Sequence, residues 1–172
     1  MSRHMIAYDL APGRFNFRAA AVVLREGHVL VGRAMRETIW YLPGGRVEWG
    51  ETTRETVERE LIEELGVVGR VGELALVIEN FFTHEEQRCH ELAYYYPALL
   101  PEAFPFRSDG EVCHRGRDGY VELEFKWLPL DAASLRASQF RPIALGDELA
   151  GFGDAFRHLV FMEPTWGFGD HE

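Results

Sequence analysis

The sequence has few cysteines and no long apolar run. Its two cysteines, Cys89 and Cys113, lack the spacing of a metal-binding motif, so we expect reduced thiols in a cytoplasmic protein. The longest apolar stretch, residues 19–24, is far too short to span a bilayer. No apolar segment follows the first five residues, so we expect neither a secretory signal peptide nor a membrane partner.

Basic residues are also scarce. The chain has 18 lysines and arginines against 28 aspartates and glutamates, a net charge of −10. Nucleic-acid-binding modules are usually basic, so this balance argues against a polynucleotide partner. It does not argue against a phosphate-bearing small molecule, because bound cations invert the electrostatics of an acidic pocket. With 172 residues, 47% of them apolar, the composition predicts one globular domain, residues 1–172, with a sizeable core.

Residues 45–67 contain an ordered set of glycines and charged residues. Their pattern is Gly-x5-Glu-x7-Arg-Glu-apolar-x-Glu-Glu-x-Gly-apolar, with no position missing. The residues that fill it are Gly45, Glu51, Arg59, Glu60, Leu61, Glu63, Glu64, Gly66 and Val67. From average residue frequencies, chance produces such a match on the order of 10⁻⁹ to 10⁻¹⁰ times per starting position. The pattern is therefore specific.

The middle of this segment is predicted to be a helix at residues 53–65. Thr52 and Glu55 have the spacing of a capping box, in which each side chain accepts a hydrogen bond from a free backbone N–H. Gly66 can take the left-handed conformation that ends a helix. At about 100° per residue, an apolar stripe and an acidic stripe lie side by side on the helix. They consist of Val57, Leu61 and Leu65, and of Glu60, Glu63 and Glu64.

The acidic stripe has two interpretations. Most charged helix faces are simply solvated, although like charges one turn apart destabilise a helix. The alternative is a cation site, because Mg²⁺ and Mn²⁺ prefer oxygen ligands. Pro43-Gly44-Gly45 precedes the helix, and it would form either a strand-ending turn or a close backbone approach to a ligand. The glycines and arginine ordered around the stripe favour the cation site.

Residues 45–67 resemble the Nudix box, the signature of hydrolases that cleave nucleoside diphosphates linked to another moiety. The resemblance implies an α/β fold, the Nudix α/β/α sandwich with a mixed central sheet, in which the box forms a loop–helix–loop. It also implies that Glu60, Glu63 and Glu64 bind Mg²⁺ or Mn²⁺, with the Gly44 carbonyl as a further ligand.

The same resemblance implies catalytic roles. The cations would neutralise charge on the pyrophosphate and activate a water molecule. Arg59 would hold a neighbouring glutamate, most simply Glu51, by a charge-assisted hydrogen bond that positions the helix. One of the three metal-binding glutamates would instead act as general base. Members of the family differ on which one, so that role stays unassigned.

The rest of the chain predicts strands on both sides of the helix. A hairpin is expected from residues 17–24 and 29–34, and further strands from residues 74–82, 89–100 and 120–128. A short helix is expected to begin at Asp131, and a C-terminal helix within residues 147–161. The turn-rich segment 101–119 is either a substrate-binding loop or a plain connection.

Two residues outside the box are candidates for substrate binding. Glu124 lies on the polar face of the strand predicted at 120–128, where many relatives place a further acid, although strand glutamates often face water. Arg33 precedes the box by a few residues, where relatives often place a phosphate-contacting arginine, although a solvated arginine is equally expected.

The substrate is predicted by elimination. Markers of ADP-ribose hydrolases, diadenosine polyphosphate hydrolases and NADH pyrophosphatases are absent after the box, where Phe81, Phe82 and His84 stand instead. A nucleoside or deoxynucleoside di- or triphosphate remains as the expected substrate. The open alternatives are a dinucleoside polyphosphate, ADP-ribose or a nucleotide sugar, and a non-catalytic nucleotide-binding module. Isoprenoid diphosphate isomerisation and RNA 5′-end hydrolysis are less supported. Many relatives are dimers, so a homodimer is also open.

Overall fold

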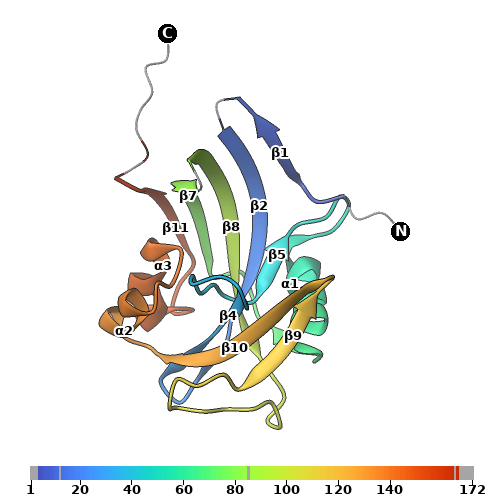
Figure 1. Ribbon diagram of the computed structural model, residues 1–172, viewed down its shortest axis with the longest axis vertical. Coiled ribbons are helices and arrows are strands. Elements are labelled where there is room, and N and C mark those ends of the chain that lie inside the picture. The colour runs from blue at the N-terminus through green and yellow to red at the C-terminus, as the bar shows by residue number, and fades with distance from the viewer. Residues whose placement is uncertain (1–3, 12, 85, 165, 167–172) are drawn as a thin grey trace.

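The computed structural model describes residues 4–11, 13–84, 86–164 and 166, which form two sheets flanked by helices (Figure 1). The larger sheet consists of β1 (Ala7–Leu10), β2 (Gly13–Val22), β5 (Gly44–Arg46), β6 (Arg70–Val71), β7 (Leu76–His84), β8 (Gln87–Leu99) and β11 (Arg157–Met162). The smaller sheet consists of β3 (Leu24–Arg25), β4 (His28–Ala34), β9 (His114–Asp118) and β10 (Val121–Pro129).

The central sheet is mixed, as predicted. Its strand order is β1-β2-β8-β7-β11, with β5 paired to β2 and β6 paired to β8. β2 runs parallel to β8, and β11 runs parallel to β7, whereas its other pairs are antiparallel. The strands predicted at 74–82, 89–100 and 120–128 are β7, β8 and β10, which confirms those three predictions.

The predicted box helix is confirmed as α1 (Thr53–Leu65). Thr52 Oγ1 accepts from the Glu55 backbone N–H at 3.2 Å, and Glu55 Oε2 accepts from the Thr52 backbone N–H at 2.8 Å. Gly66 ends the helix with a φ of 70°, a left-handed conformation that glycine adopts without strain. The local sequence therefore specifies both ends of this helix.

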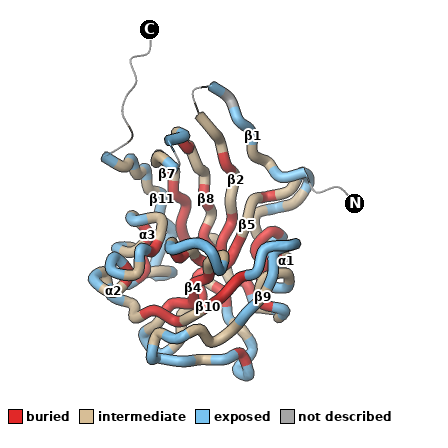
Figure 2. Tube along the Cα trace, viewed as in Figure 1, coloured by how far each residue is buried: buried red, intermediate tan, exposed pale blue. Residues whose placement is uncertain are grey.

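Helices cover opposite faces of the larger sheet, because the side chains of β2 alternate. Ala19 and Ala21 belong to the core cluster that includes the apolar stripe of α1. Ala20 and Val22 belong to a second cluster with α2 (Ala132–Ala137), α3 (Ile143–Glu148) and the short helix η1 (Leu149–Gly151). The result is the α/β/α arrangement, with its buried residues concentrated in the central strands (Figures 1 and 2).

The hairpin predicted from residues 17–24 and 29–34 forms only next to its turn. β3 pairs with β4 around Glu26 and Gly27, which have φ values of 47° and 71°. The residues before it, in β2, instead pair with β8 and β5 in the larger sheet. The C-terminal end of β2 is buried on both faces. A strand of this kind lies inside a sheet, with a neighbouring strand on each side and a packed layer on each face.

The helix predicted within residues 147–161 is wrong. α3 ends at Glu148, η1 ends at Gly151, and Gly153 has a φ of 93°, which interrupts helical geometry. Arg157–Met162 then forms β11, which satisfies the backbone groups of β7 along its edge. The short helix expected at Asp131 is confirmed as α2, whose Ser134 backbone N–H donates to Asp131 at 2.9 Å.

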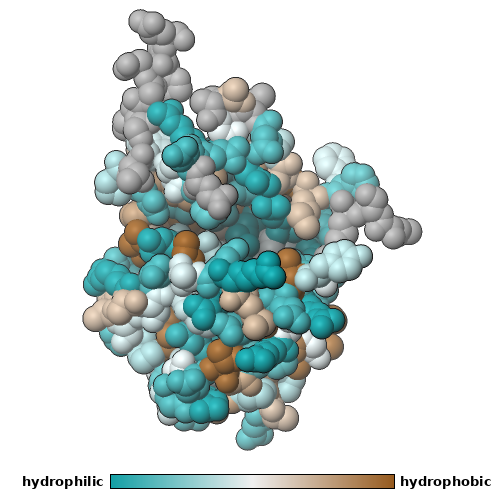
Figure 3. Space-filling model, in the orientation of Figure 1, coloured by the Kyte–Doolittle hydropathy of each residue, from teal (hydrophilic) through white to brown (hydrophobic). Residues whose placement is uncertain are grey.

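The segment 101–119 is not wholly a loop, because its last part is β9, which pairs with β10. No helix in the described part of the chain is long and apolar enough to cross a membrane. The face of the molecule seen in Figure 3 is largely hydrophilic, with small apolar areas scattered over it.

Candidate active site

Arg59 is the centre of an ion-pair network on α1. Its Nε and Nη2 donate to the two carboxylate oxygens of Glu51 at 2.8 and 3.0 Å. Its Nη1 donates to Glu60 at 2.7 Å and to Glu63 at 3.1 Å. The guanidinium group therefore fixes three glutamates of the box with one planar fork.

Glu51 is held in its charged form by several donors. Besides Arg59, the Thr56 hydroxyl donates to it at 2.7 Å and the Glu48 backbone N–H at 3.1 Å. Burial by itself would raise the pKa of Glu51, but these hydrogen bonds leave the pKa below its ordinary value. Hydrogen bonding to Glu51 in turn raises the pKa of Arg59 against the opposing effect of burial. This pair joins the loop before α1 to the middle of the helix.

The acidic stripe of α1 also contacts the paired glycines. The Gly44 backbone N–H donates to Glu64 Oε2 at 3.0 Å. Glu60 lies so close to Gly45 that a Cβ atom there would be 2.0 Å from Glu60 Oε1. Gly44 has a φ of 145°, and a Cβ on it would be 2.3 Å from the carbonyl oxygen of Ala19. Gly45 therefore lets the acidic stripe approach β5, and Gly44 lets β5 approach the backbone of β2.

Burial and mutual repulsion make the charged forms of these carboxylates less stable than they would be in water. Burial raises the pKa of Glu60, although hydrogen bonding to Arg59 opposes the shift. Burial, and then the charge of Glu60, raises the pKa of Glu64 to about 8. The charge of Asp118, at the end of β9, raises the pKa of both groups further. A positive charge placed among them would relieve this cost.

The site fits a divalent cation by its donor chemistry. Its candidate ligands are the oxygens that Mg²⁺ and Mn²⁺ prefer: the carboxylates of Glu60, Glu63 and Glu64 and the carbonyl of Gly44. Across the residues that the structure describes, no three acidic, histidine or cysteine side chains are yet arranged around one point. Arg59 binds Glu60 and Glu63, and the Gly44 N–H binds Glu64, so a cation would share these carboxylates with the donors that hold them here.

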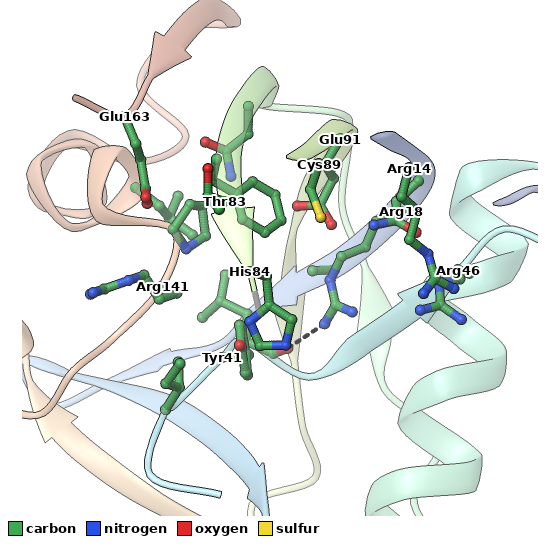
Figure 4. Close-up of a pocket in the computed structure, with 18 of the residues that line it drawn as sticks. Arg14, Arg18, Tyr41, Arg46, Thr83, His84, Cys89, Glu91, Arg141 and Glu163 are labelled. Atoms are coloured by element: carbon green, nitrogen blue, oxygen red, sulfur yellow. Dashed lines mark hydrogen bonds between the residues drawn. The ribbon is translucent and has the colours of Figure 1, made fainter. Parts of the chain in front are cut away.

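A cleft of about 340 Å³ opens on the sheet face opposite α1, next to β5. Arg18 lines the cleft (Figure 4), and its Nη2 donates to the Leu42 carbonyl at 3.3 Å and to the Gly44 carbonyl, next to the acidic stripe, at 2.8 Å. The charge of Arg18 also lowers the pKa of Glu60 and Glu64. Arg18 thus links the edge of the cleft to the backbone beside the acidic stripe, although Glu60, Glu63 and Glu64 do not line the cleft itself.

The cleft is rich in positive charge, although the chain as a whole is acidic. Four arginines and two glutamates line it: Arg14, Arg18, Arg46 and Arg141, with Glu91 and Glu163. Arg14, Arg18 and Arg46 gather on the side nearest α1, and Arg141 lies on the opposite side (Figure 4). Burial, and then repulsion from Arg14 and Arg18, lowers the pKa of Arg46. A cluster of arginines such as this one is suited to bind the oxygens of a phosphate chain.

The two substrate-binding candidates outside the box contact each other. Arg33 Nε and Nη2 donate to Glu124 Oε1 at 2.8 and 2.6 Å, and the guanidinium carbon lies 4.2 Å from the centre of the Trp40 ring. Glu124 is buried, so it does not face water as a polar strand residue usually would. Neither residue lines the cleft, and their part in substrate binding stays a prediction.

Sequence reasoning missed Asp118 and the polar residues of the cleft. Asp118 belongs to the segment 101–119, which is expected from the sequence to be a substrate-binding loop or a plain connection. Arg14, Asn16 and Arg18 stand at every second position of β2, an alternation that could have indicated one polar face on this strand. Only the pairing of β2, β8 and β7 brings this face together with Asn80 and Glu91.

The chain is similar to known proteins in both sequence and fold. The model of the NUDIX domain family matches residues 15–145. A MutT-like protein of Streptomyces ambofaciens is 30% identical over 156 residues, which cover 87% of this chain and 90% of the relative. A mutator protein named MutT4 of Mycobacterium tuberculosis is 36% identical over 125 residues, which cover 70% of this chain but only 46% of the relative. The chain thus spans about half the length of that relative.

Among solved structures, the mutator MutT protein from Bacillus halodurans superimposes with a TM-score of 0.59. The superposition covers 88% of this chain and 93% of that protein, at 18% sequence identity. At this low sequence identity, the superposition shows that the two proteins share a fold and nothing beyond it.

Proposed function

The chain belongs to the Nudix family of hydrolases, and from this premise we propose that it hydrolyses a pyrophosphate bond in a nucleoside or deoxynucleoside di- or triphosphate. One observation supports the proposal most. The acidic stripe of α1 adjoins a cleft lined by arginines, and Arg18 contacts the backbone that connects them. A phosphate chain can therefore lie with one end at the carboxylates and the other in the cleft.

Each part of the site then has a chemical task. Glu60, Glu63 and Glu64 would hold Mg²⁺ or Mn²⁺, with the Gly44 carbonyl as a further ligand. The bound cation supplies charge neutralisation at phosphorus and a lowered pKa for the attacking water. Arg59 orients Glu60 and Glu63 through its Nη1 hydrogen bonds.

Protein side chains carry out the remaining steps, which are phosphate binding, proton transfer and stabilisation of the leaving group. Arg14, Arg18 and Arg46 bind the oxygens of the phosphates that extend into the cleft. The attacking water forms a new P–O bond, the bridging P–O bond breaks, and the proton of the water passes to one of the glutamates. The leaving phosphate or pyrophosphate carries away the electrons of the broken bond, and its charge is stabilised by the arginines.

A substrate panel tests this function. We expect Mg²⁺-dependent release of pyrophosphate or phosphate from nucleoside tri- and diphosphates, and no release in EDTA. A dinucleoside polyphosphate, ADP-ribose or a nucleotide sugar that turned over far faster would contradict the proposed substrate. Absence of any turnover, together with nucleotide binding, would identify a non-catalytic module.

Two variants test the assigned residues. Glu63→Gln and Glu64→Gln should each lower kcat by on the order of 10²- to 10³-fold while the protein stays folded. Glu58→Gln is the matched control, because Glu58 is an exposed glutamate of the same helix. Near-normal turnover of either active-site variant at saturating Mg²⁺ would show that the ligand set is wrong.

A further inference from the structure

Three polar residues form one row across the floor of the cleft. In the strand register, Asn16 of β2 stands beside Glu91 of β8, and Glu91 stands beside Asn80 of β7. All three side chains line the cleft. The row lies on the middle strands of the sheet, and the arginines of β2 and β5 stand next to it on the side of α1 (Figure 4).

Two of the three side chains in the row carry a buried acceptor oxygen to which no described group donates a hydrogen bond. Asn16 is 8% exposed and Asn80 is 4% exposed, and the Oδ1 atom of each has no hydrogen-bond partner among the described residues. Within the same part of the chain, no group donates a hydrogen bond to Glu91, and Arg18 and Arg46 act on it through space. Buried acceptors are rarely left without a donor, so these two Oδ1 atoms, with a carboxylate between them, indicate a ligand that supplies donors.

Burial and the neighbouring arginines act on the Glu91 carboxyl in opposite directions. Burial raises the pKa of Glu91, whereas the positive charges of Arg18 and Arg46 oppose the shift and stabilise the carboxylate. A carboxylate presents two acceptor oxygens in one plane, which match two adjacent N–H donors. With the phosphates on the arginine side, the base of a nucleotide would lie over this row.

The bases differ in the donors that they offer. Guanine has a ring N–H next to an exocyclic amino group, two adjacent donors that a carboxylate can accept together. Adenine and cytosine have one amino group beside a ring acceptor, and that acceptor would face a carboxylate oxygen. Uracil and thymine have one ring N–H between two carbonyls. Among these bases, guanine is the one whose edge presents two adjacent donors to the Glu91 carboxylate.

We propose that Asn16, Glu91 and Asn80 are specificity-determining residues that bind the base of the substrate, and that they select a guanine nucleotide. This inference rests on the proposed function, because it places the phosphates at the arginines and α1. The cleft, at about 340 Å³, is within the usual size range of small-molecule sites. Phe82 and Tyr41 also line it and offer aromatic surface to a planar base.

The sharpest test compares GTP with ITP, which lacks only the exocyclic amino group. In the wild-type protein, kcat/KM for GTP should exceed that for ITP by about tenfold or more. ITP lacks the amino group that would donate to Glu91, so one carboxylate oxygen would stay unpaired. ATP and CTP should also be poorer substrates than GTP. In Glu91→Gln the GTP-to-ITP ratio should fall towards one, and in Asn80→Ala it should fall in the same direction.

Glu163→Gln is the matched control, because Glu163 lies on the other side of the same cleft (Figure 4). It should keep the GTP-to-ITP ratio of the wild-type protein. Binding of GMP and IMP, measured by calorimetry, provides a readout that needs no turnover, and GMP should bind more tightly. Circular dichroism and thermal unfolding verify that each variant is folded.

The outcomes separate this inference from the proposed function. Mg²⁺-dependent hydrolysis with equal rates for GTP and ITP, or with a preference for ATP or CTP, would overturn the base assignment and leave the hydrolase proposal intact. Tighter binding of GMP than IMP without hydrolysis of any nucleotide would support the base assignment and contradict the hydrolase proposal. An unchanged ratio in both Glu91→Gln and Asn80→Ala would also overturn the assignment.

Discussion

Arg59 contacts three glutamates of the box through a single guanidinium group. Its two hydrogen bonds to Glu51 are bidentate, and both side chains are largely shielded from water. Lysine has the same charge, but its ammonium group cannot form this planar fork. The geometry of the acidic stripe therefore depends on the shape of the Arg59 side chain as well as on its charge.

Arg59→Lys should destabilise the protein by about 1.5–3 kcal/mol, the usual value of hydrogen bonds to charged groups. Urea unfolding measures the change. The control is Arg107→Lys, which alters a pair with Asp109 that is about half exposed. That change should be clearly smaller, because exposed pairs contribute little. Equal midpoints for the two variants would contradict the importance of the fork.

Asp118 acts on the acidic stripe from a different element. It ends β9, whose Gly116 packs so closely on α1 that a Cβ atom would be 1.7 Å from the Glu64 carbonyl oxygen. Its negative charge adds to those of Glu60 and Glu64. The structure thus adds a fourth acid to the neighbourhood of the candidate cation site.

Asp118→Asn should raise the Mg²⁺ concentration needed for half-maximal activity by several-fold. One charge near a surface is worth about 1 kcal/mol or somewhat more, and its loss weakens attraction for the cation. A Mg²⁺ titration of activity measures this midpoint. Asp154→Asn, on an exposed turn, is the control and should leave it unchanged. An unchanged midpoint in Asp118→Asn would show that this acid does not contribute.

At the scale of the element, two glycines frame α1 for different reasons. Gly66 ends the helix in a left-handed conformation, and a Cβ atom there would contact nothing within 4 Å. Gly45 has no such conformational demand, but a Cβ atom there would collide with Glu60. Gly66 is needed for the backbone conformation that ends the helix, and Gly45 is needed because Glu60 occupies the space next to it.

Alanine substitutions separate these two roles. Gly66→Ala should cost about 1–2 kcal/mol, because a non-glycine residue is strained in the left-handed region, and it should leave kcat unchanged. Gly45→Ala should displace Glu60 and lower kcat by about tenfold or more, with little change in stability. Denaturant unfolding and steady-state kinetics on both variants measure the contrast. The reverse pattern would contradict this division of roles.

At the scale of the whole molecule, the larger sheet separates two functional surfaces. Its one face packs against α1, and its other face carries the cleft beside α3. The two surfaces meet at β5, where Gly45 leaves room for Glu60 and the backbone of Gly44 binds Glu64 through its N–H and Arg18 through its carbonyl. A cation bound there would neutralise the acidic charge that the folded protein holds together.

Mg²⁺ should therefore stabilise the folded protein. At a concentration of about 100 times Kd, a ligand that binds only the folded state adds about 2.7 kcal/mol, and for a chain of this size the Tm rises by roughly 2–4 °C per kcal/mol. Thermal unfolding in Mg²⁺ and in EDTA measures the shift. Glu64→Gln should lose most of it and Glu58→Gln should keep it. The same shift in both variants would place the cation elsewhere.

Much of the fold could be predicted from the sequence where the signals are local. The capping box at Thr52, the terminating Gly66 and the apolar stripe between them specify α1 without help from the rest of the chain. The predictions failed where a distant partner decides the structure. Arg157–Met162 is a strand because the edge of β7 is available to it, and β2 leaves its hairpin because β8 and β5 flank it.

The sequence by itself determined the family and the class of chemistry, because the box places its carboxylates, arginine and glycines within one helix and its flanking turns. Only the tertiary structure decided what lies next to that helix. Asn16, Asn80 and Glu91 are far apart in the chain and become neighbours through the pairing of β2, β8 and β7. Strand register is a long-range property, set by packing on both faces of the sheet, and no local pattern contains it.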